Sequence, residues 1–195
     1  MLLLPLARIG WDAFQGGLGA NPIEAVQNRL GFWAITLLAL SLVPTPAWDL
    51  FRVGWPQRLR RVIGVTAFAY ALLHFRFYVG VDKFFDLHTI WQDLTRRPFL
   101  MVGFATLLCL APLAITSTDG WVQRLGYRRW RLVHRLVYPA AVLAVIHFAW
   151  RVKADLRRPL LFAAIFALLL AMRVPGWIGG ARRARGRAPA PRGGP

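Results

Sequence analysis

Long apolar runs alternate with short polar connections along most of the chain. At a rise of about 1.5 Å per residue, a helix needs about 20 mainly apolar residues to cross the hydrocarbon core of a bilayer. Five runs approach or reach that length, and a shorter apolar segment, interrupted by Pro5, Arg8 and Asp12, precedes them. The predicted segments are residues 1–14, 30–48, 62–81, 98–115, 131–150 and 159–174. The pattern therefore predicts an all-α integral membrane helix bundle of about six transmembrane helices, the first one short.

Composition and charge agree with a membrane protein. Of the 195 residues, 57% are hydrophobic, and the formal net charge of +17 comes from basic residues placed between the apolar runs and at the C-terminus. Such placement follows the positive-inside rule, so we expect a multi-pass protein with both termini in the cytoplasm and no nucleic-acid partner. The single cysteine, Cys109, excludes an intramolecular disulfide.

Domain organisation follows from the same pattern. Residues 1–178 are expected to form one transmembrane domain. Residues 179–195, rich in Arg, Pro and Gly, are expected to form a disordered basic cytoplasmic tail because they cannot bury a core. A signal peptide is the alternative for residues 1–14, but no basic region precedes their apolar residues, which favours a short first helix.

Histidines inside the predicted spans carry the candidate chemistry. A neutral imidazole in an apolar bundle needs partners for its nitrogens, and a metal is one of them. His134 and His147 lie thirteen residues apart in the fifth span, roughly 20 Å along a helix, with Pro139 as a predicted kink between them. This spacing suits two stacked electron carriers, one near each membrane surface.

The predicted depth of each histidine in the membrane separates a pair from a single residue. His74, late in the third span, lies at a depth similar to that of His147, so a haem held between helices three and five would have two axial imidazoles, an arrangement that favours electron transfer. His134 lies nearer the cytoplasm without an equally placed partner. His88 falls in an outer connection and is not expected to be a ligand. The alternative is that these histidines only pack.

Arginines near the histidines are candidate partners for haem propionates. Guanidinium groups pair well with carboxylates, which a bound haem would bring into the membrane. Interfacial snorkelling explains the same arginines equally well. The candidates are Arg60, near His134, together with Arg76 and Arg151, near the His74 and His147 pair.

Several short motifs together resemble a known family. The chain is similar to the MsrQ family of ferric-reductase-like transmembrane proteins over residues 16–174. The matching segments are Gly16–Pro22, Arg60–Gly64, Leu73–His74, Arg97–Phe99, Thr116–Thr118, Leu125–Tyr138 and Ile146–Trp150.

The resemblance implies a function. Family members are electron-transfer subunits, not the catalytic subunits, of a methionine sulfoxide reductase system in the bacterial inner membrane. The resemblance implies one or two b-type haems held by His74, His134 and His147, with FMN as a further cofactor linked to the family. Electrons would pass from the quinone pool to MsrP, a periplasmic molybdopterin enzyme. A ferric reductase or oxidase-like carrier fed by a cytosolic flavin reductase is the alternative, and a cofactor-free membrane anchor is a third reading.

Overall fold

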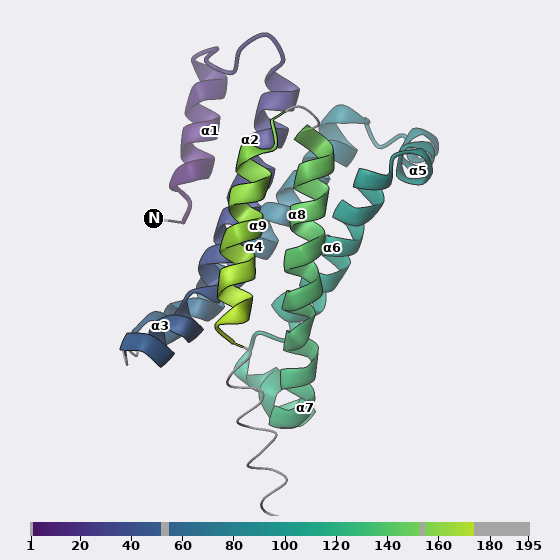
Figure 1. Ribbon diagram of the computed structural model, residues 1–195. Helices are drawn as coiled ribbons and strands as arrows, with labels where there is room; N and C mark the ends of the chain where they lie inside the picture. Colours follow the sequence, from purple (N-terminus) through teal and green to yellow (C-terminus); the bar gives the residue numbers. More distant parts are fainter. Residues whose placement is uncertain (1, 52–54, 153–154, 174–195) are drawn as a thin grey trace, which may run out of the picture.

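The computed structural model describes residues 2–51, 55–152 and 155–173, which form helices and no strands (Figure 1). The expected tail, residues 179–195, lies outside these described residues. The elements are α1 (Leu4–Phe14), α2 (Pro22–Leu42), α3 (Pro44–Phe51), α4 (Trp55–Phe77), the π-helical turn η1 (Tyr78–Asp82), α5 (Leu87–Arg96), α6 (Pro98–Ile115), α7 (Asp119–Val133), the 3-10 turn η2 (His134–Leu136), α8 (Val137–Val152) and α9 (Arg157–Ala171).

Four helices form the centre of the bundle. The most extensive contacts join α2 to α4 and α6 to α8, while α9 packs on α8 and α1 packs on α2 (Figure 1). The core between them includes Leu42, Tyr70, Ala140 and Ala141, each at most 1% exposed. Helix α5 lies at one end of the bundle and α7 at the other, and we refer to these as the α5 end and the α7 end.

The all-α membrane bundle predicted from the sequence is confirmed. Four helical stretches in the described part of the chain are long and apolar enough to cross a membrane: Pro22–Trp48, Leu59–Asp82, Pro98–Ile115 and Asp119–Val152. Helix α1 is short, as expected, with 11 residues, and α9 has 15. The total of six spans stays a prediction.

Local signals begin α2 at the Asn21–Pro22 turn, ahead of the apolar span that was predicted from Leu30. The side chain of Asn21 accepts a hydrogen bond from the backbone N–H of Glu24 at 3.2 Å, and Pro22 occupies the first turn. Both features favour a helix start, so α2 begins at Pro22 and not near Leu30. At its other end, Pro44 begins the separate helix α3.

The predicted kink in the fifth span lies slightly before Pro139. A proline removes one backbone donor and its ring clashes with the carbonyl group four residues earlier, here that of Arg135. The chain accordingly forms the 3-10 turn η2 over His134–Leu136, and α8 begins at Val137. Helix α5, by contrast, lies in a connection for which the apolar pattern predicted no helix.

A larger side chain at a buried position of α8 tests how closely this helix packs against its neighbours. Ala141 is completely buried, so we expect Ala141→Leu to destabilise the fold by about 1–3 kcal/mol, because the added side chain has no space. The measurement is thermal unfolding in detergent, followed by circular dichroism. The matched control is Val142→Leu, at a neighbouring position that is 52% exposed. Equal melting temperatures for the two variants would contradict the packing described.

Candidate functional site

Two histidines from different helices meet inside the bundle. His74 projects from α4 and His147 from α8, and their ring centroids are 6.2 Å apart at an interplanar angle of 81°. The structure thus brings together the two residues that depth alone had paired. They are 73 positions apart in the sequence (147 − 74), and the whole of α6 lies between them along the chain.

Backbone carbonyl groups orient both rings. Nδ1 of His74 lies 2.9 Å from the carbonyl oxygen of Gln27, and Nδ1 of His147 lies 2.7 Å from that of Phe99. A carbonyl oxygen only accepts hydrogen bonds, so each Nδ1 is the donor and carries the proton. The other nitrogen of each neutral ring, Nε2, is therefore unprotonated. This is the usual state of a metal-binding histidine, whose second nitrogen donates to a carbonyl or carboxylate.

A glycine makes room for each ring. Gly31 follows Gln27 by one helical turn, and Gly103 follows Phe99 by one turn. A Cβ atom on Gly31 would lie 3.1 Å from Cε1 of His74, and one on Gly103 would lie 2.6 Å from Cε1 of His147. Because Cα–Cβ bonds tilt toward the N-terminus of a helix, a side chain here would fill the space in front of the carbonyl group.

The two histidines are held in the same way by two helical hairpins. In the α2–α4 pair, the histidine and its carbonyl partner are 47 residues apart, and in the α6–α8 pair they are 48 apart. In both hairpins the first helix supplies the carbonyl group and the glycine, and the second supplies the imidazole. The site therefore has an approximate internal symmetry, with one ring presented from each half.

This donor set fits a haem. With metal–nitrogen bonds of about 2 Å, two imidazoles that bind one metal from opposite sides have centroids about 6 Å apart. The described residues contain no group of three or more His, Cys, Asp and Glu side chains that could hold a metal ion. A pair of imidazoles alone suits a metal that brings its own equatorial ligands, as a haem iron does.

A cavity opens beside the pair at the α5 end. Its volume is about 500 Å³, and it is lined by Gln27 and Phe99, the two residues whose carbonyl oxygens accept the hydrogen bonds from the imidazoles. Glu24 and Arg151 meet across it in an ion pair of 2.6 Å. A larger recess of about 820 Å³ adjoins it and shares Arg97, Phe99 and Trp150. Charged and aromatic groups therefore surround an opening that is lined by both residues whose carbonyl groups hold the histidines.

His134 lies apart, at the α7 end. Its Nδ1 donates to the carbonyl oxygen of Trp130 at 3.1 Å, and its ring stacks on the indole with centroids 4.0 Å apart. The indole itself donates to the carbonyl oxygen of Thr116 at 2.9 Å. His134 is thus a held, half-buried imidazole with an unprotonated Nε2, but the structure places no second histidine opposite it.

The candidate arginines occupy different places. Arg151 lines the cavity beside the His74 and His147 pair. Arg76 is exposed on α4, and Arg60 is half-buried within electrostatic reach of His134. His88 is exposed on α5, where its Nε2 lies 2.7 Å from the side-chain nitrogen of Gln92, away from the paired histidines.

Sequence reasoning missed several residues of this site. The carbonyl groups of Gln27 and Phe99 give no signal in a sequence, because every residue has one. Gly31 and Gly103 gave a weak signal, since an isolated glycine within a helical pattern often marks a close approach. Arg97 was noted only as part of a motif, yet it lines both cavities.

Comparisons with known proteins show the family to which the chain belongs. Residues 30–145 match the model of the family described as "Ferric reductase like transmembrane component". A Rhodospirillum rubrum protein named "Protein-methionine-sulfoxide reductase heme-binding subunit MsrQ" is 51% identical over 187 residues, which cover 96% of this chain and 89% of the relative.

Further relatives carry the same name. The protein from Deinococcus radiodurans is 48% identical, with 86% of this chain and 82% of the relative covered. The protein from Caulobacter vibrioides is 44% identical, with 87% and 81% covered. The family model covers more than half of the chain and the Rhodospirillum rubrum relative covers 96% of it, so the chain belongs to the MsrQ family of ferric reductase-like transmembrane proteins.

Proposed function

We propose that this chain is the electron-carrying membrane subunit of a methionine sulfoxide reductase system. In this proposal it takes electrons from the quinone pool and passes them to a periplasmic molybdopterin reductase of the MsrP type, which performs the catalysis. The names of the relatives support a haem-binding subunit of such a system. The donor and the side of the membrane on which the partner docks are our inference.

The pairing of His74 with His147 carries the proposal. Both rings lie between the two hairpins with centroids 6.2 Å apart, and both Nδ1 atoms are bonded to backbone carbonyl groups, which leaves both Nε2 atoms for one iron. A b-type haem bound there would supply a one-electron carrier whose two axial positions are filled, which favours electron transfer over oxygen chemistry.

Other residues of the chain would hold the group in place. The carbonyl groups of Gln27 and Phe99 fix the ring orientations, and the glycines opposite keep the space clear. We assign Arg151 to the haem carboxylates because it lines the adjoining cavity, and we add Arg97 for the same reason. Arg76 and Arg60 stay as predicted partners.

His134 is proposed as the site of a second carrier at the α7 end. Thirteen residues separate it from His147, roughly 20 Å along a helix. The number of haems, one or two, depends on whether His134 binds iron without a second histidine. FMN stays a prediction from the family resemblance.

Charge supports an orientation in the bacterial inner membrane. Basic residues concentrate in α7, while the connection at the α5 end contains Asp82, Asp86 and Asp93. By the positive-inside rule, the α7 end and both termini would face the cytoplasm, and the α5 end with its cavity would face the periplasm.

A ferric reductase fed by a cytosolic flavin reductase is the second candidate, which the family description favours. Purified protein reduced under anaerobic conditions separates the two functions. Rapid re-oxidation by the periplasmic methionine sulfoxide reductase with its substrate, and slow re-oxidation by ferric chelates, would support the proposed function. The reverse order would favour the second candidate.

Removal of either paired histidine tests the site itself. We expect His74→Ala and His147→Ala to lose the same low-spin haem signal, because each variant would leave the iron one axial imidazole. The measurement is the absorption spectrum of the purified protein with a haem-to-protein ratio. His88→Ala is the control and should keep full haem content, since His88 is exposed on α5. An undiminished low-spin signal in either of the first two variants would refute the pairing.

Glycine substitutions test the space around the rings. We expect Gly103→Ala to reduce haem content more than Gly31→Ala, because the added methyl group would lie 2.6 Å from the ring of His147 but 3.1 Å from that of His74. The retained haem should show a shifted reduction potential, which a general loss of stability would not produce. Gly10→Ala, where a methyl group meets nothing within 4 Å, is the control.

The second carrier, which we propose at His134, can be tested separately. In membranes that contain His134→Ala, we expect slower reduction of the remaining haem by a quinol analogue and slower turnover of the methionine sulfoxide reductase. Stopped-flow absorbance and an enzymatic assay measure the two rates. Wild-type values for both would remove His134 from the electron path.

A further inference from the structure

The connection between α4 and α6 lies where two predicted spans end. The span that includes η1 ends at Asp82, and α6 begins at Pro98. Helix α5, between them, has 10 residues and is about 15 Å long, half the thickness of the hydrocarbon core. It cannot cross the bilayer, and Figure 1 shows it beside the end of α6 and not over the top of the bundle.

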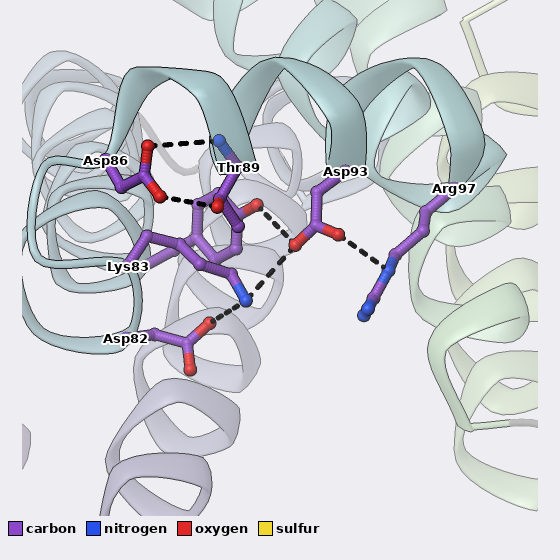
Figure 2. Close-up of polar contacts among 7 residues, drawn as sticks. Asp82, Lys83, Asp86, Thr89, Asp93 and Arg97 are labelled. Atoms are coloured by element: carbon purple, nitrogen blue, oxygen red, sulfur yellow. Dashed lines mark hydrogen bonds and ion pairs between the residues drawn. The ribbon is translucent and has the colours of Figure 1, made fainter.

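Ion pairs join the polar side chains of this connection to one another and to the ends of the two spans. Asp93 is 9% exposed and accepts a hydrogen bond from the Tyr78 hydroxyl at 3.2 Å. It also forms ion pairs with Nζ of Lys83 at 3.1 Å and with Nε of Arg97 at 3.0 Å (Figure 2). Lys83 also pairs with Asp82 at 3.4 Å. One buried carboxylate thus ties α5 to the ends of both neighbouring spans.

Asp86 caps the first turn of α5. It accepts hydrogen bonds from the backbone N–H of Thr89 at 3.2 Å and from the Thr89 hydroxyl (Figure 2). It also accepts one from the backbone N–H of His88 at 3.0 Å. The bond from this hydroxyl is the main reason that the pKa of Asp86 lies below its ordinary value, so the cap is ionised at neutral pH. The short helix is therefore well defined despite its exposed position.

The outward side of the same connection is apolar. Phe84, Phe85, Leu87 and Trp91 are between 66% and 79% exposed. Leu87 and Trp91 are one helical turn apart and lie on one face of α5. Phe84 and Phe85 have φ values of 48° and 60°, a left-handed conformation that is unusual for aromatic residues. The chain therefore adopts a strained turn that leaves two aromatic rings outside the core.

We propose that these four residues form a lipid anchor: Phe84, Phe85, Leu87 and Trp91 insert into the boundary between headgroups and acyl chains. Amphipathic helices bind this layer through an apolar face, and aromatic residues favour it. The two flanking spans end near Asp82 and Pro98, and the ends of membrane spans lie at the depth of this boundary layer. Exposed polar residues of α5, His88 and Arg96, lie on other faces of the helix and meet water or headgroups.

The ion-pair network connects the proposed anchor to the cavity beside the paired histidines. Tyr78, Asp82 and Arg97 belong to that network and also line the cavity of about 500 Å³ beside the paired histidines. Contact of α5 with lipid would therefore hold one wall of this cavity at the depth of the headgroups. This inference goes beyond the proposed function and does not depend on it.

Spin labels measure the depth of α5 directly. The full chain carrying Cys109→Ala receives a single cysteine through Trp91→Cys, Leu87→Cys or His88→Cys, and each protein is labelled with a nitroxide. The proteins are reconstituted in vesicles of phosphatidylcholine and phosphatidylglycerol. Relaxation by oxygen, which concentrates in lipid, is compared with relaxation by a water-soluble nickel chelate.

We expect labels at positions 87 and 91 to be relaxed several-fold more by oxygen than by the chelate, and the label at position 88 to show the reverse. All three substituted side chains are exposed, so the fold should persist, and circular dichroism checks this. Equal access of the chelate to all three positions would overturn the proposal. Protection of positions 87 and 91 only after addition of the soluble methionine sulfoxide reductase would also overturn it, in favour of a protein-docking face.

Discussion

The hydrogen bond from each half-buried imidazole of the pair to a backbone carbonyl group is the interaction on which the site depends. An imidazole nitrogen without a partner is costly in an apolar bundle, so each ring must satisfy one nitrogen from the protein. Here the bonds from His74 to Gln27 and from His147 to Phe99 do so at 2.9 Å and 2.7 Å. They fix the tautomer of both rings and leave the Nε2 atom of each ring without a proton.

This constraint explains the close packing of the helix pairs. A ring can reach a carbonyl group of the neighbouring helix only where the next turn of that helix carries no side chain, and Gly31 and Gly103 meet this condition. The same arrangement in both hairpins means that neither half completes the site alone. Binding of a shared haem would therefore join the two halves of the bundle as well as supply a redox centre.

The two ends of the bundle differ in chemistry. The α5 end combines an ion-pair network centred on Asp93 with the cavity that Gln27 and Phe99 line. The α7 end holds His134 against Trp130 among basic residues. A chain that carries electrons across a membrane requires such a difference, because donor and acceptor approach from different places. The family relationship and the geometry therefore favour the same kind of function.

The sequence by itself determined the all-α membrane class, the bounds of α6 at Pro98 and Ile115, and the similar depth of His74 and His147. These follow from hydropathy, proline positions and residue counts along a helix, which are local properties of a sequence. The sequence predicted a kink at Pro139 but not the 3-10 turn η2 that precedes this proline, and it predicted no helix at α5, which a buried carboxylate holds in place. Only the tertiary structure decided which carbonyl groups hold the imidazoles and which glycines admit them, because these contacts join residues 43 to 48 positions apart and depend on how whole helices pack.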